Sequence, residues 1–226
     1  MIQFSHVYKT YIGSVHALRN VEFQIDKGEF AFLTGPSGAG KTTLFRLISA
    51  FDKPSSGKVH VAGTNISHLT EKDVPFFRRK IGVVFQDFRL LKDRTLAENV
   101  ALPLEIKGEK SHIIDRKVNE MLEQLGLINR KYQYPKQVSG GEQQRVAIAR
   151  ALIHQPGVLI ADEPTGNLDP KLSEEIMDLL ERVNAQGTTV FVATHDHELV
   201  KRRAKRNIVL EAGQIQNHGH FNEASL

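Results

Sequence analysis

Gly35-Pro36-Ser37-Gly38-Ala39-Gly40-Lys41-Thr42 is the stretch of this sequence that decides the fold. It matches the pattern G-x-x-x-x-G-K-[ST] in full, after the apolar run 30–34 and before a helical pattern that begins near Lys41. Glycines let backbone N–H groups surround phosphate oxygens, and a helix N-terminus adds partial positive charge. A glycine-rich turn with a chance lysine is the alternative, but the flanking strand and helix favour a phosphate site.

The same loop predicts the first ligand contacts. We expect Lys41 to reach the β- and γ-phosphates and the Thr42 hydroxyl to ligate a metal ion, with Thr43 beside it in the phosphate site. The predicted ligand is therefore ATP with Mg²⁺ as its cofactor.

The flanking sequence reads as an α/β fold. Apolar strand patterns occupy 21–25, 30–34, 81–85, 158–161 and 188–194, helical patterns begin near 41 and 172, and a hairpin is expected over 208–215. Strands that alternate with helices predict a mostly parallel sheet. Between them, helical spacing dominates from 88 to 155, where Ile113, Val118, Met121, Leu122 and Leu125 form an apolar stripe. We predict a core over about 1–87 and 156–226 with a helical lobe inserted over about 88–155.

Composition restricts the classes of protein. The 226 residues carry a formal net charge of +4 and no cysteine, which excludes disulfides and thiolate chemistry. No apolar segment approaches the roughly 18 residues of a membrane-spanning helix, and no targeting segment is visible. We therefore expect a soluble, cytoplasmic chain that reaches a membrane only through a partner or its own surface.

Two carboxylates follow a second apolar strand. Asp162 and Glu163 come directly after Val158–Ala161, at the strand end where α/β sheets bind ligands. We expect Asp162 to hold Mg²⁺ and Glu163 to polarise the attacking water, because one carboxylate would face the metal and the other the γ-phosphate. A solvated turn is the alternative for such a strand end taken alone.

The run Ser139-Gly140-Gly141-Glu142 predicts a second anion site, because it precedes a helix. One γ-phosphate does not need two such sites in one molecule. The natural solution is a head-to-tail pair in which each Ser139 completes the other subunit's site. The alternative is a plain capping box between Ser139 and Glu142, and both can hold together.

Three isolated residues are further candidates. Gln86 and His195 each follow a predicted strand, near the expected γ-phosphate, although a structural polar role is the commoner one for either alone. Tyr11 could stack on adenine, whereas a surface or core tyrosine is the ordinary alternative.

Taken in chain order, these motifs together resemble the ATP-binding cassette family over essentially the whole chain: the P-loop, Gln86, the Ser139 run, Asp162-Glu163, Asn167-Leu168-Asp169 and then His195. The resemblance implies a P-loop NTPase with a RecA-like core, an N-terminal antiparallel β subdomain and an inserted helical subdomain, which pairs as a nucleotide-sandwich homodimer in the ATP state. It implies that Gln86 senses Mg²⁺ and the water, and that His195 holds the γ-phosphate for hydrolysis. It also implies an interface formed by Ser139, Gly140, Gly141 and Asp169, with Glu142 in the ATP site. Val138 and Glu142 depart from the commonest signature, which has Leu and Gln there.

Finer matches at 85–95, 134–137 and 164–169 are similar to the cell-division branch of the family. That similarity implies an integral membrane partner of the FtsX type, a peripheral location on the cytoplasmic face of the bacterial inner membrane, and control of cell-wall hydrolysis; no nucleic acid partner is expected. The alternatives are the ATPase of a lipoprotein or macrolide exporter, and a cassette protein acting on ribosomes or nucleic acid.

Three surface features stay open. Leu90 and Leu91 could dock a partner helix beside Gln86 or pack inside the helical lobe. The basic run 201–206 could contact lipid headgroups or RNA, or form a solvated helix end. His218 and His220 offer two metal ligands at most.

Overall fold

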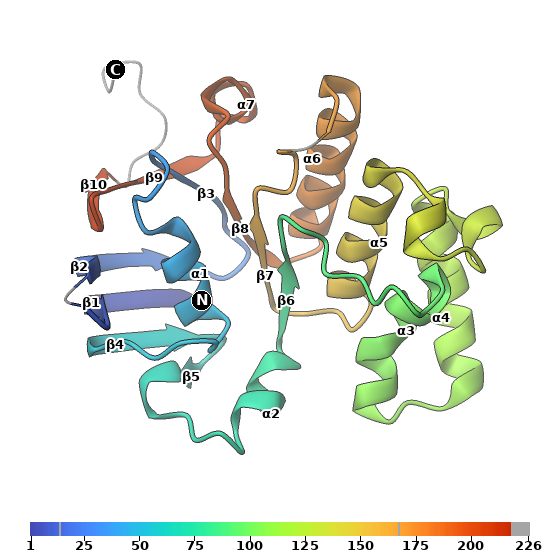
Figure 1. Ribbon diagram of the computed structural model, residues 1–226, viewed down its shortest axis with the longest axis horizontal. Coiled ribbons are helices and arrows are strands. Elements are labelled where there is room, and N and C mark those ends of the chain that lie inside the picture. The colour runs from blue at the N-terminus through green and yellow to red at the C-terminus, as the bar shows by residue number, and fades with distance from the viewer. Residues whose placement is uncertain (14, 167, 218–226) are drawn as a thin grey trace.

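The computed structural model describes residues 1–13, 15–166 and 168–217, which form two sheets with helices around them (Figure 1). The first sheet is antiparallel, with strand order β2-β1-β4-β5. Its strands are β1 (Ile2–Tyr11), β2 (Val15–Ile25), β4 (Ser56–Val61) and β5 (Thr64–Asn65). Phe4 pairs with Phe23, so the apolar residues that alternate along β1 and β2 share one buried face.

The second sheet has strand order β10-β9-β3-β8-β7-β6. Its strands are β3 (Phe30–Thr34), β6 (Ile81–Val84), β7 (Val158–Asp162), β8 (Thr189–Ala193), β9 (Arg206–Glu211) and β10 (Gln214–Asn217). All neighbours are parallel except β9 and β10, which form the predicted hairpin. The central strands β3, β7 and β8 are nearly continuous buried runs because both faces of the sheet are covered there. The predicted α/β fold class is confirmed.

The helices lie around the two sheets. They are α1 (Lys41–Ile48), α2 (Val74–Arg78), α3 (Leu96–Lys107), α4 (Ser111–Gln124), α5 (Gly140–Leu152), α6 (Pro170–Ala185) and α7 (His197–Arg203), with short 3₁₀ turns at Ile66–His68, Ile128–Arg130 and Pro135–Gln137. Figure 1 shows α3, α4 and α5 gathered on the right, and α1 between the two sheets on the left.

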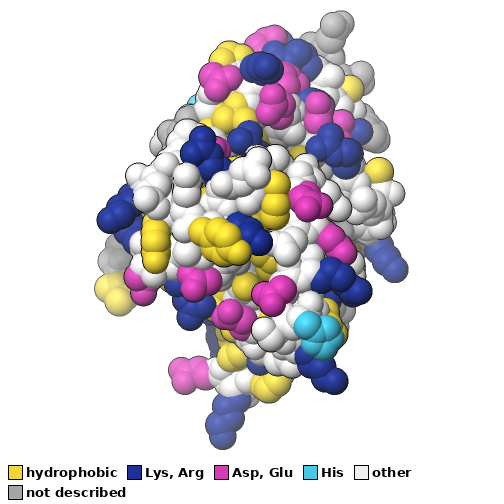
Figure 2. All heavy atoms as spheres, turned by 90° about the vertical axis from the view of Figure 1, so that its right-hand side faces the viewer, with side chains coloured by type: hydrophobic (Ala, Val, Ile, Leu, Met, Phe, Trp, Pro, Cys, Tyr) yellow, Lys and Arg dark blue, Asp and Glu magenta, His cyan; other side chains and the backbone are white. Residues whose placement is uncertain are grey.

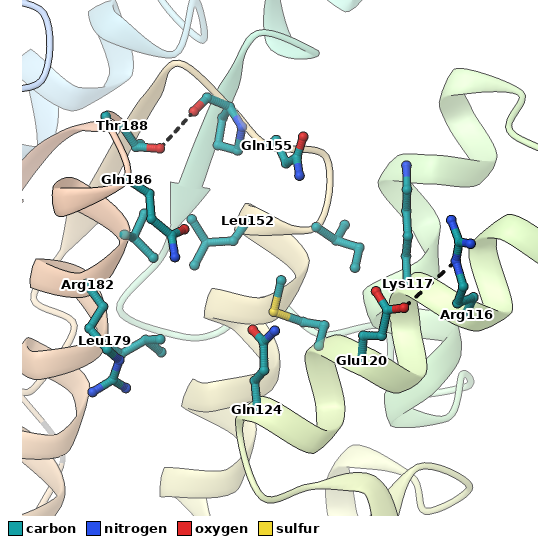
Figure 3. Close-up of a pocket in the computed structure, with 15 residues that line it drawn as sticks. Arg116, Lys117, Glu120, Gln124, Leu152, Gln155, Leu179, Arg182, Gln186 and Thr188 are labelled. Carbon is teal, nitrogen blue, oxygen red and sulfur yellow. Dashed lines mark hydrogen bonds and ion pairs between the residues drawn. The ribbon is translucent and has the colours of Figure 1, made fainter.

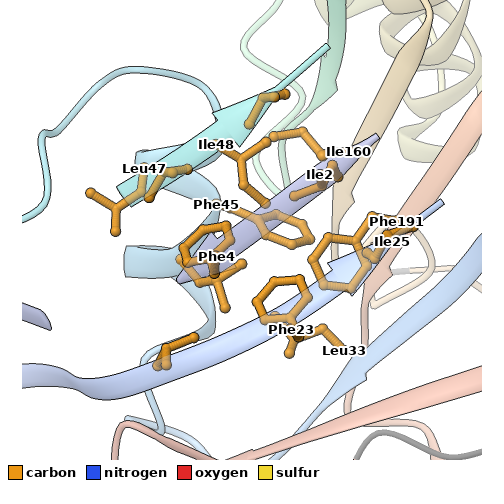
Figure 4. Close-up of a cluster of buried hydrophobic side chains, with 14 of the residues drawn as sticks. Ile2, Phe4, Phe23, Ile25, Leu33, Phe45, Leu47, Ile48, Ile160 and Phe191 are labelled. Carbon is orange, nitrogen blue, oxygen red and sulfur yellow. The ribbon is translucent and has the colours of Figure 1, made fainter. Parts of the chain in front are cut away.

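The largest apolar cluster joins the two sheets through α1 (Figure 4). Phe4 stacks on Phe23 with ring centroids 4.8 Å apart, and Phe45 of α1 lies 5.2 Å from Phe191 of β8. The buried residues of α1 are Leu44, Phe45, Leu47 and Ile48. This packing fixes the start of α1, and with it the glycine-rich loop, against the second sheet.

The helical lobe has its own apolar cluster, and there one predicted core residue is wrong. Ile114, Val118 and Leu122 are the buried residues of α4, whereas Ile113 is only half-buried. Residues 114, 118 and 122 are four apart and lie on one face, while residue 113 is rotated by one position from that face. The described outer face of this lobe carries acidic and basic side chains mixed together (Figure 2).

Candidate functional site

The glycine-rich loop joins buried strand β3 to α1 in a conformation that needs glycine at two positions. Gly35 has φ 146°, and a Cβ built there would lie 2.0 Å from the carbonyl oxygen of Leu210. Gly40 caps α1 at φ 110°, and its Cβ would lie 2.6 Å from the carbonyl oxygen of Ala17. Pro36, Ser37 and Gly38 form the exposed tip of the loop, while Ala39 is buried.

Lys41 folds back over this loop, and Thr42 faces the neighbouring strand end. The Lys41 Nζ donates to the carbonyls of Gly35 at 2.6 Å and Pro36 at 3.2 Å. Thr42 Oγ1 donates to Asp162 Oδ2 at 3.5 Å. The structure therefore brings the loop and the first predicted carboxylate together.

The two carboxylates at the end of β7 have different environments. Burial and the neighbouring Glu163 charge raise the pKa of Asp162, while the Thr42 hydroxyl, Lys41 and Arg89 oppose the rise. Glu163 has a left-handed backbone with φ 49°, which is unusual for a residue with a Cβ. Its Oε2 lies 2.8 Å from the Nδ1 of His195, which follows β8.

A cavity of about 490 Å³ lies beside the carboxyl ends of β6 and β7. Thr42, Gln86 and Asp162 line it together, so the Gln86 predicted from the end of β6 does reach the same space. A hydroxyl, an amide and a carboxylate supply the oxygen donors that Mg²⁺ prefers. The raised pKa of Asp162 reflects a buried negative charge with too little positive charge around it, which fits a cation at this place.

The Ser139 segment stands at the start of α5 and forms the predicted capping box. Ser139 Oγ accepts from the Glu142 N–H at 3.2 Å, while the Glu142 carboxylate accepts from the Ser139 N–H at 2.8 Å. A Cβ on Gly141 would lie 2.0 Å from a methyl carbon of Leu172, so α5 packs closely on α6 here. Asp169 caps α6 by accepting from the Leu172 N–H at 3.0 Å.

This second segment is not part of the first site within one chain. In residues 1–13, 15–166 and 168–217, no hydrogen bond joins 139–142 to the loop 35–43. Figure 1 shows the start of α5 and α1 on opposite sides of β7 and β8. Gly140, at the first position of α5, has nothing within 4 Å of the place where a Cβ would stand.

Tyr11 belongs to a network that the sequence did not predict. Its hydroxyl donates to Asp52 at 2.7 Å, and Arg46 of α1 donates to the same carboxylate oxygen at 2.7 Å. Lys9 covers one face of the ring at 4.9 Å from its centroid. The position of Asp52, just beyond α1, carries no sequence signal for this contact.

Two more residues near the site were missed. Arg89 lines the cavity with Gln86 and opposes the rise in the pKa of Asp162. Gln144 is buried, and its amide donates to the Pro164 carbonyl at 2.7 Å, directly after the two carboxylates. Only their nearness to Gln86 and to the Ser139 run could have drawn attention to them.

A larger cavity of about 970 Å³ lies between α4, α5 and α6 (Figure 3). Gln155, Gln186 and Thr188 border it near the starts of β7 and β8, which is the opposite edge of the sheet from Asp162 and Glu163. None of the sequence-predicted site residues lines this cavity.

The three surface features left open by the sequence are Leu90-Leu91, the basic run 201–206 and the two tail histidines. Leu90 packs against the helical-lobe cluster, whereas Leu91 is exposed. The basic run closes α7 and is paired: Arg202 and Arg203 contact Glu174 of α6, and Lys205 contacts Glu181. The run is therefore a helix end whose basic side chains are paired with carboxylates of α6. His218 and His220 lie outside the described residues.

Comparison with known proteins identifies the family. The sequence model of the ABC transporter family matches residues 18–166. The chain is 51% identical over 219 residues to the cell division ATP-binding protein FtsE of Escherichia coli (strain K12), covering 97% of this chain and 98% of that protein. It is 48% identical over 215 residues to FtsE of Bacillus subtilis (strain 168), covering 95% and 94%.

A solved structure agrees with these relatives. The ATP-binding cassette MJ0796, in a dimeric post-hydrolysis state bound to ADP and Pi, superposes with a TM-score of 0.91 at 39% identity, covering 98% of this chain and 99% of that one. In the described part of the chain, no helix is long and apolar enough to cross a membrane. The chain therefore belongs to the ABC transporter family as an FtsE-like ATP-binding-cassette ATPase.

Proposed function

We propose that two copies of this chain hydrolyse ATP with Mg²⁺ at sites shared between them. The observation that carries the proposal is the separation of the loop 35–42 from the capped Ser139 segment within one chain. Two anion-binding helix starts that do not meet in a monomer can meet across a two-fold axis, where each copy supplies the half that the other lacks. The dimeric MJ0796 cassette bound to ADP and Pi supports this arrangement.

Each side chain then has a role that its position supports. Lys41 binds the β- and γ-phosphates, while Thr42, Gln86 and Asp162 hold Mg²⁺, which supplies charge neutralisation at the phosphates. Glu163 accepts a proton from the attacking water. His195, whose Nδ1 lies 2.8 Å from the Glu163 carboxylate in this structure, holds the γ-phosphate when ATP is bound.

The remaining residues complete the shared site. Tyr11 stacks on adenine, and Asp169 at the start of α6 contacts the partner copy. Ser139, Gly140 and Gly141 face the partner's γ-phosphate, and the bond from Ser139 to Glu142 keeps the backbone amides in position. In this proposal the chain consists of a core over about 1–87 and 156–226 and a helical lobe over about 88–155. The lobe carries the second half-site.

The partner proposed for the dimer is an integral membrane protein of the FtsX type, which would place the chain at the cytoplasmic face of the inner membrane. Phe51, Phe85 and Arg89 border the cavity beside Gln86, and Phe51 is exposed there. Such an apolar rim beside the catalytic end of the sheet suits a short docked helix. An exporter ATPase would use the same surface, so co-purification from membranes decides the partner.

Mixing two inactive variants tests the shared site. Lys41→Ala removes the phosphate lysine, and Ser139→Arg blocks the second half-site. A mixed dimer then holds one intact site, so an equal mixture should recover up to about a quarter of the parental turnover. Each variant alone is the control. A mixture with no more activity than its components would contradict sites shared between copies.

A further inference from the structure

Arg150 is a half-buried arginine in the last turn of α5 that lies outside the roles described so far. Its Nη1 donates to the Arg89 carbonyl at 2.6 Å, and its Nη2 donates to the Phe88 carbonyl at 2.7 Å. The two ends of the guanidinium fork thus bind two successive carbonyls of the turn that follows β6. Gln86 lies in that turn, which spans residues 85–89.

The bound turn has an unusual backbone. Phe88 and Arg89 are both left-handed, with φ 59° and 48°, although neither is glycine. Side chains with a Cβ disfavour this region, and two such residues in succession persist only where the surroundings hold them. The N–H of Phe88 donates to the Phe85 carbonyl at 3.1 Å, which makes the turn tight. The Arg150 fork is the contact from α5 that holds these two peptide groups.

An ordinary structural role explains Arg150 less well. In the described residues, no carboxylate pairs with it, unlike Arg203, whose guanidinium contacts three carboxylates on α6. Burial lowers the pKa of the Arg150 guanidinium, although an arginine stays protonated. A charge that is desolvated without a counter-charge weakens the fold unless its hydrogen bonds are strong and specific. Here the two hydrogen bonds from the Arg150 guanidinium both go to one strained turn.

The same helix also holds the next strand end. Gln144 of α5 donates to the Pro164 carbonyl, directly after Asp162 and Glu163. Helix α5 therefore contacts the turns that follow both β6 and β7, while its N-terminus carries Ser139. These contacts make α5 a rigid connection between the two strand ends and the second half-site.

We propose that Arg150 is a positioning residue that fixes the 85–89 turn, and so places Gln86 beside Thr42 and Asp162. The inference rests on the proposed function, in which Gln86 helps to hold Mg²⁺. Arg150 touches neither nucleotide nor metal and acts through the Phe88 and Arg89 carbonyls. Movement of α5 would then shift Gln86 and Ser139 together.

Arg150→Lys tests this, because lysine keeps the charge and most of the stem but cannot donate through a fork to two carbonyls. We expect kcat to fall about 10- to 100-fold, as for other supporting residues. The apparent Mg²⁺ requirement should rise, while nucleotide affinity measured without Mg²⁺ stays unchanged, since Lys41 and its loop are untouched. The matched control is Arg116→Lys on the exposed face of α4, which should change none of these values. An unchanged kcat and Mg²⁺ requirement for Arg150→Lys would overturn the proposal.

A double-mutant cycle separates this proposal from the one it rests on. If Arg150 acts through Gln86, Arg150→Lys combined with Gln86→Ala should be no slower than Gln86→Ala alone. Independent, multiplying losses would overturn the positioning role but leave the proposed function intact. A Gln86→Ala variant with parental kcat and Mg²⁺ requirement would instead contradict the role of Gln86. If Arg150→Lys does not fold, the cycle is run in a Phe88→Gly background, where glycine takes φ 59° without strain.

Discussion

The Nδ1 of His195 lies 2.8 Å from Oε2 of Glu163, and the two residues follow the neighbouring parallel strands β8 and β7. Only 11% of the Glu163 side chain is exposed, against 70% of the His195 side chain. The carboxylate is therefore enclosed by its surroundings, while the imidazole has open space beside it. This asymmetry suits a base that stays in place and a histidine that changes partner when a γ-phosphate is present.

Glu163→Gln should lower kcat about 10²- to 10⁴-fold, because the amide keeps the shape of the side chain but cannot accept the proton of the attacking water. ATP binding should persist, since Lys41 and Thr42 are unchanged, and the ATP-bound dimer should accumulate. Phosphate release and size-exclusion chromatography with ATP measure the two effects. Glu175→Gln, at an exposed position of α6, is the matched control. A parental rate for Glu163→Gln would show that the base is another group.

Asp162→Asn should separate stability from activity. The folded pKa of Asp162 is raised, so the stability associated with its neutral form is present at low pH and is lost as pH rises through the folded pKa. At neutral pH the ionised, buried carboxylate therefore weakens the nucleotide-free fold. The variant should then have the higher Tm, at roughly 2–4 °C for each kcal/mol gained, while its Mg²⁺-dependent ATPase is lost.

The pH dependence checks the cause of that effect. The Tm difference between Asp162→Asn and the parental protein should shrink as pH falls through the carboxyl range, because both side chains are then neutral. Asp115→Asn, at an exposed position of α4, is a control for the loss of one negative charge. A Tm difference that is independent of pH would mean that packing, and not the buried charge, is responsible.

The sequence predicts best those residues that both local pattern and topology fix. Gly35 to Thr42 could be placed because strand, loop and helix follow one another, and Gln86, Glu163 and His195 because parallel strands bring their ends to one edge. The pairing of Arg150 with residues 88 and 89 joins segments about sixty residues apart through backbone carbonyls, which leave no trace in residue types. The same holds for the contact between Asp52 and Tyr11. At Ile113 the apolar pattern was misassigned by one position, because the buried face of α4 runs through the neighbouring Ile114.

Gly35→Ala should destabilise the protein far more than the same change at a positive-φ glycine in open space. The added Cβ would lie 2.0 Å from the Leu210 carbonyl oxygen, which is part of β9 and cannot move aside cheaply. We expect a loss of about 3 kcal/mol or more, from backbone strain and overpacking together. Gly63→Ala is the control, because Gly63 has φ 75° with nothing within 4 Å, and should lose only about 1–2 kcal/mol. Equal losses in urea unfolding would show that φ alone sets the cost.

Arg203→Gln should destabilise the packing of α7 on α6 in a salt-dependent way. Only 12% of the Arg203 side chain is exposed, and it contacts Glu174, Asp178 at 2.6 Å and Glu181 at 3.4 Å. Glutamine leaves three neighbouring carboxylates with less positive charge between them. Because these carboxylates are partly exposed, we expect a loss of about 1–3 kcal/mol, less than for a fully buried network.

Salt distinguishes this electrostatic loss from a simple loss of packing. The Debye length falls from about 10 Å at 0.1 M to about 3 Å at 1 M, which screens the ion pairs of the parental protein and the carboxylate repulsion in the variant alike. The Tm difference between the two should therefore narrow at high salt. Arg116→Gln, which removes an exposed arginine that lies 3.8 Å from the Glu120 carboxylate, should change Tm little at either salt concentration. A Tm difference for Arg203→Gln that is the same at both salt concentrations would mean that packing of the arginine stem, and not its ion pairs, causes the loss. The charge of the basic run would then again be a candidate for contact with an anionic partner.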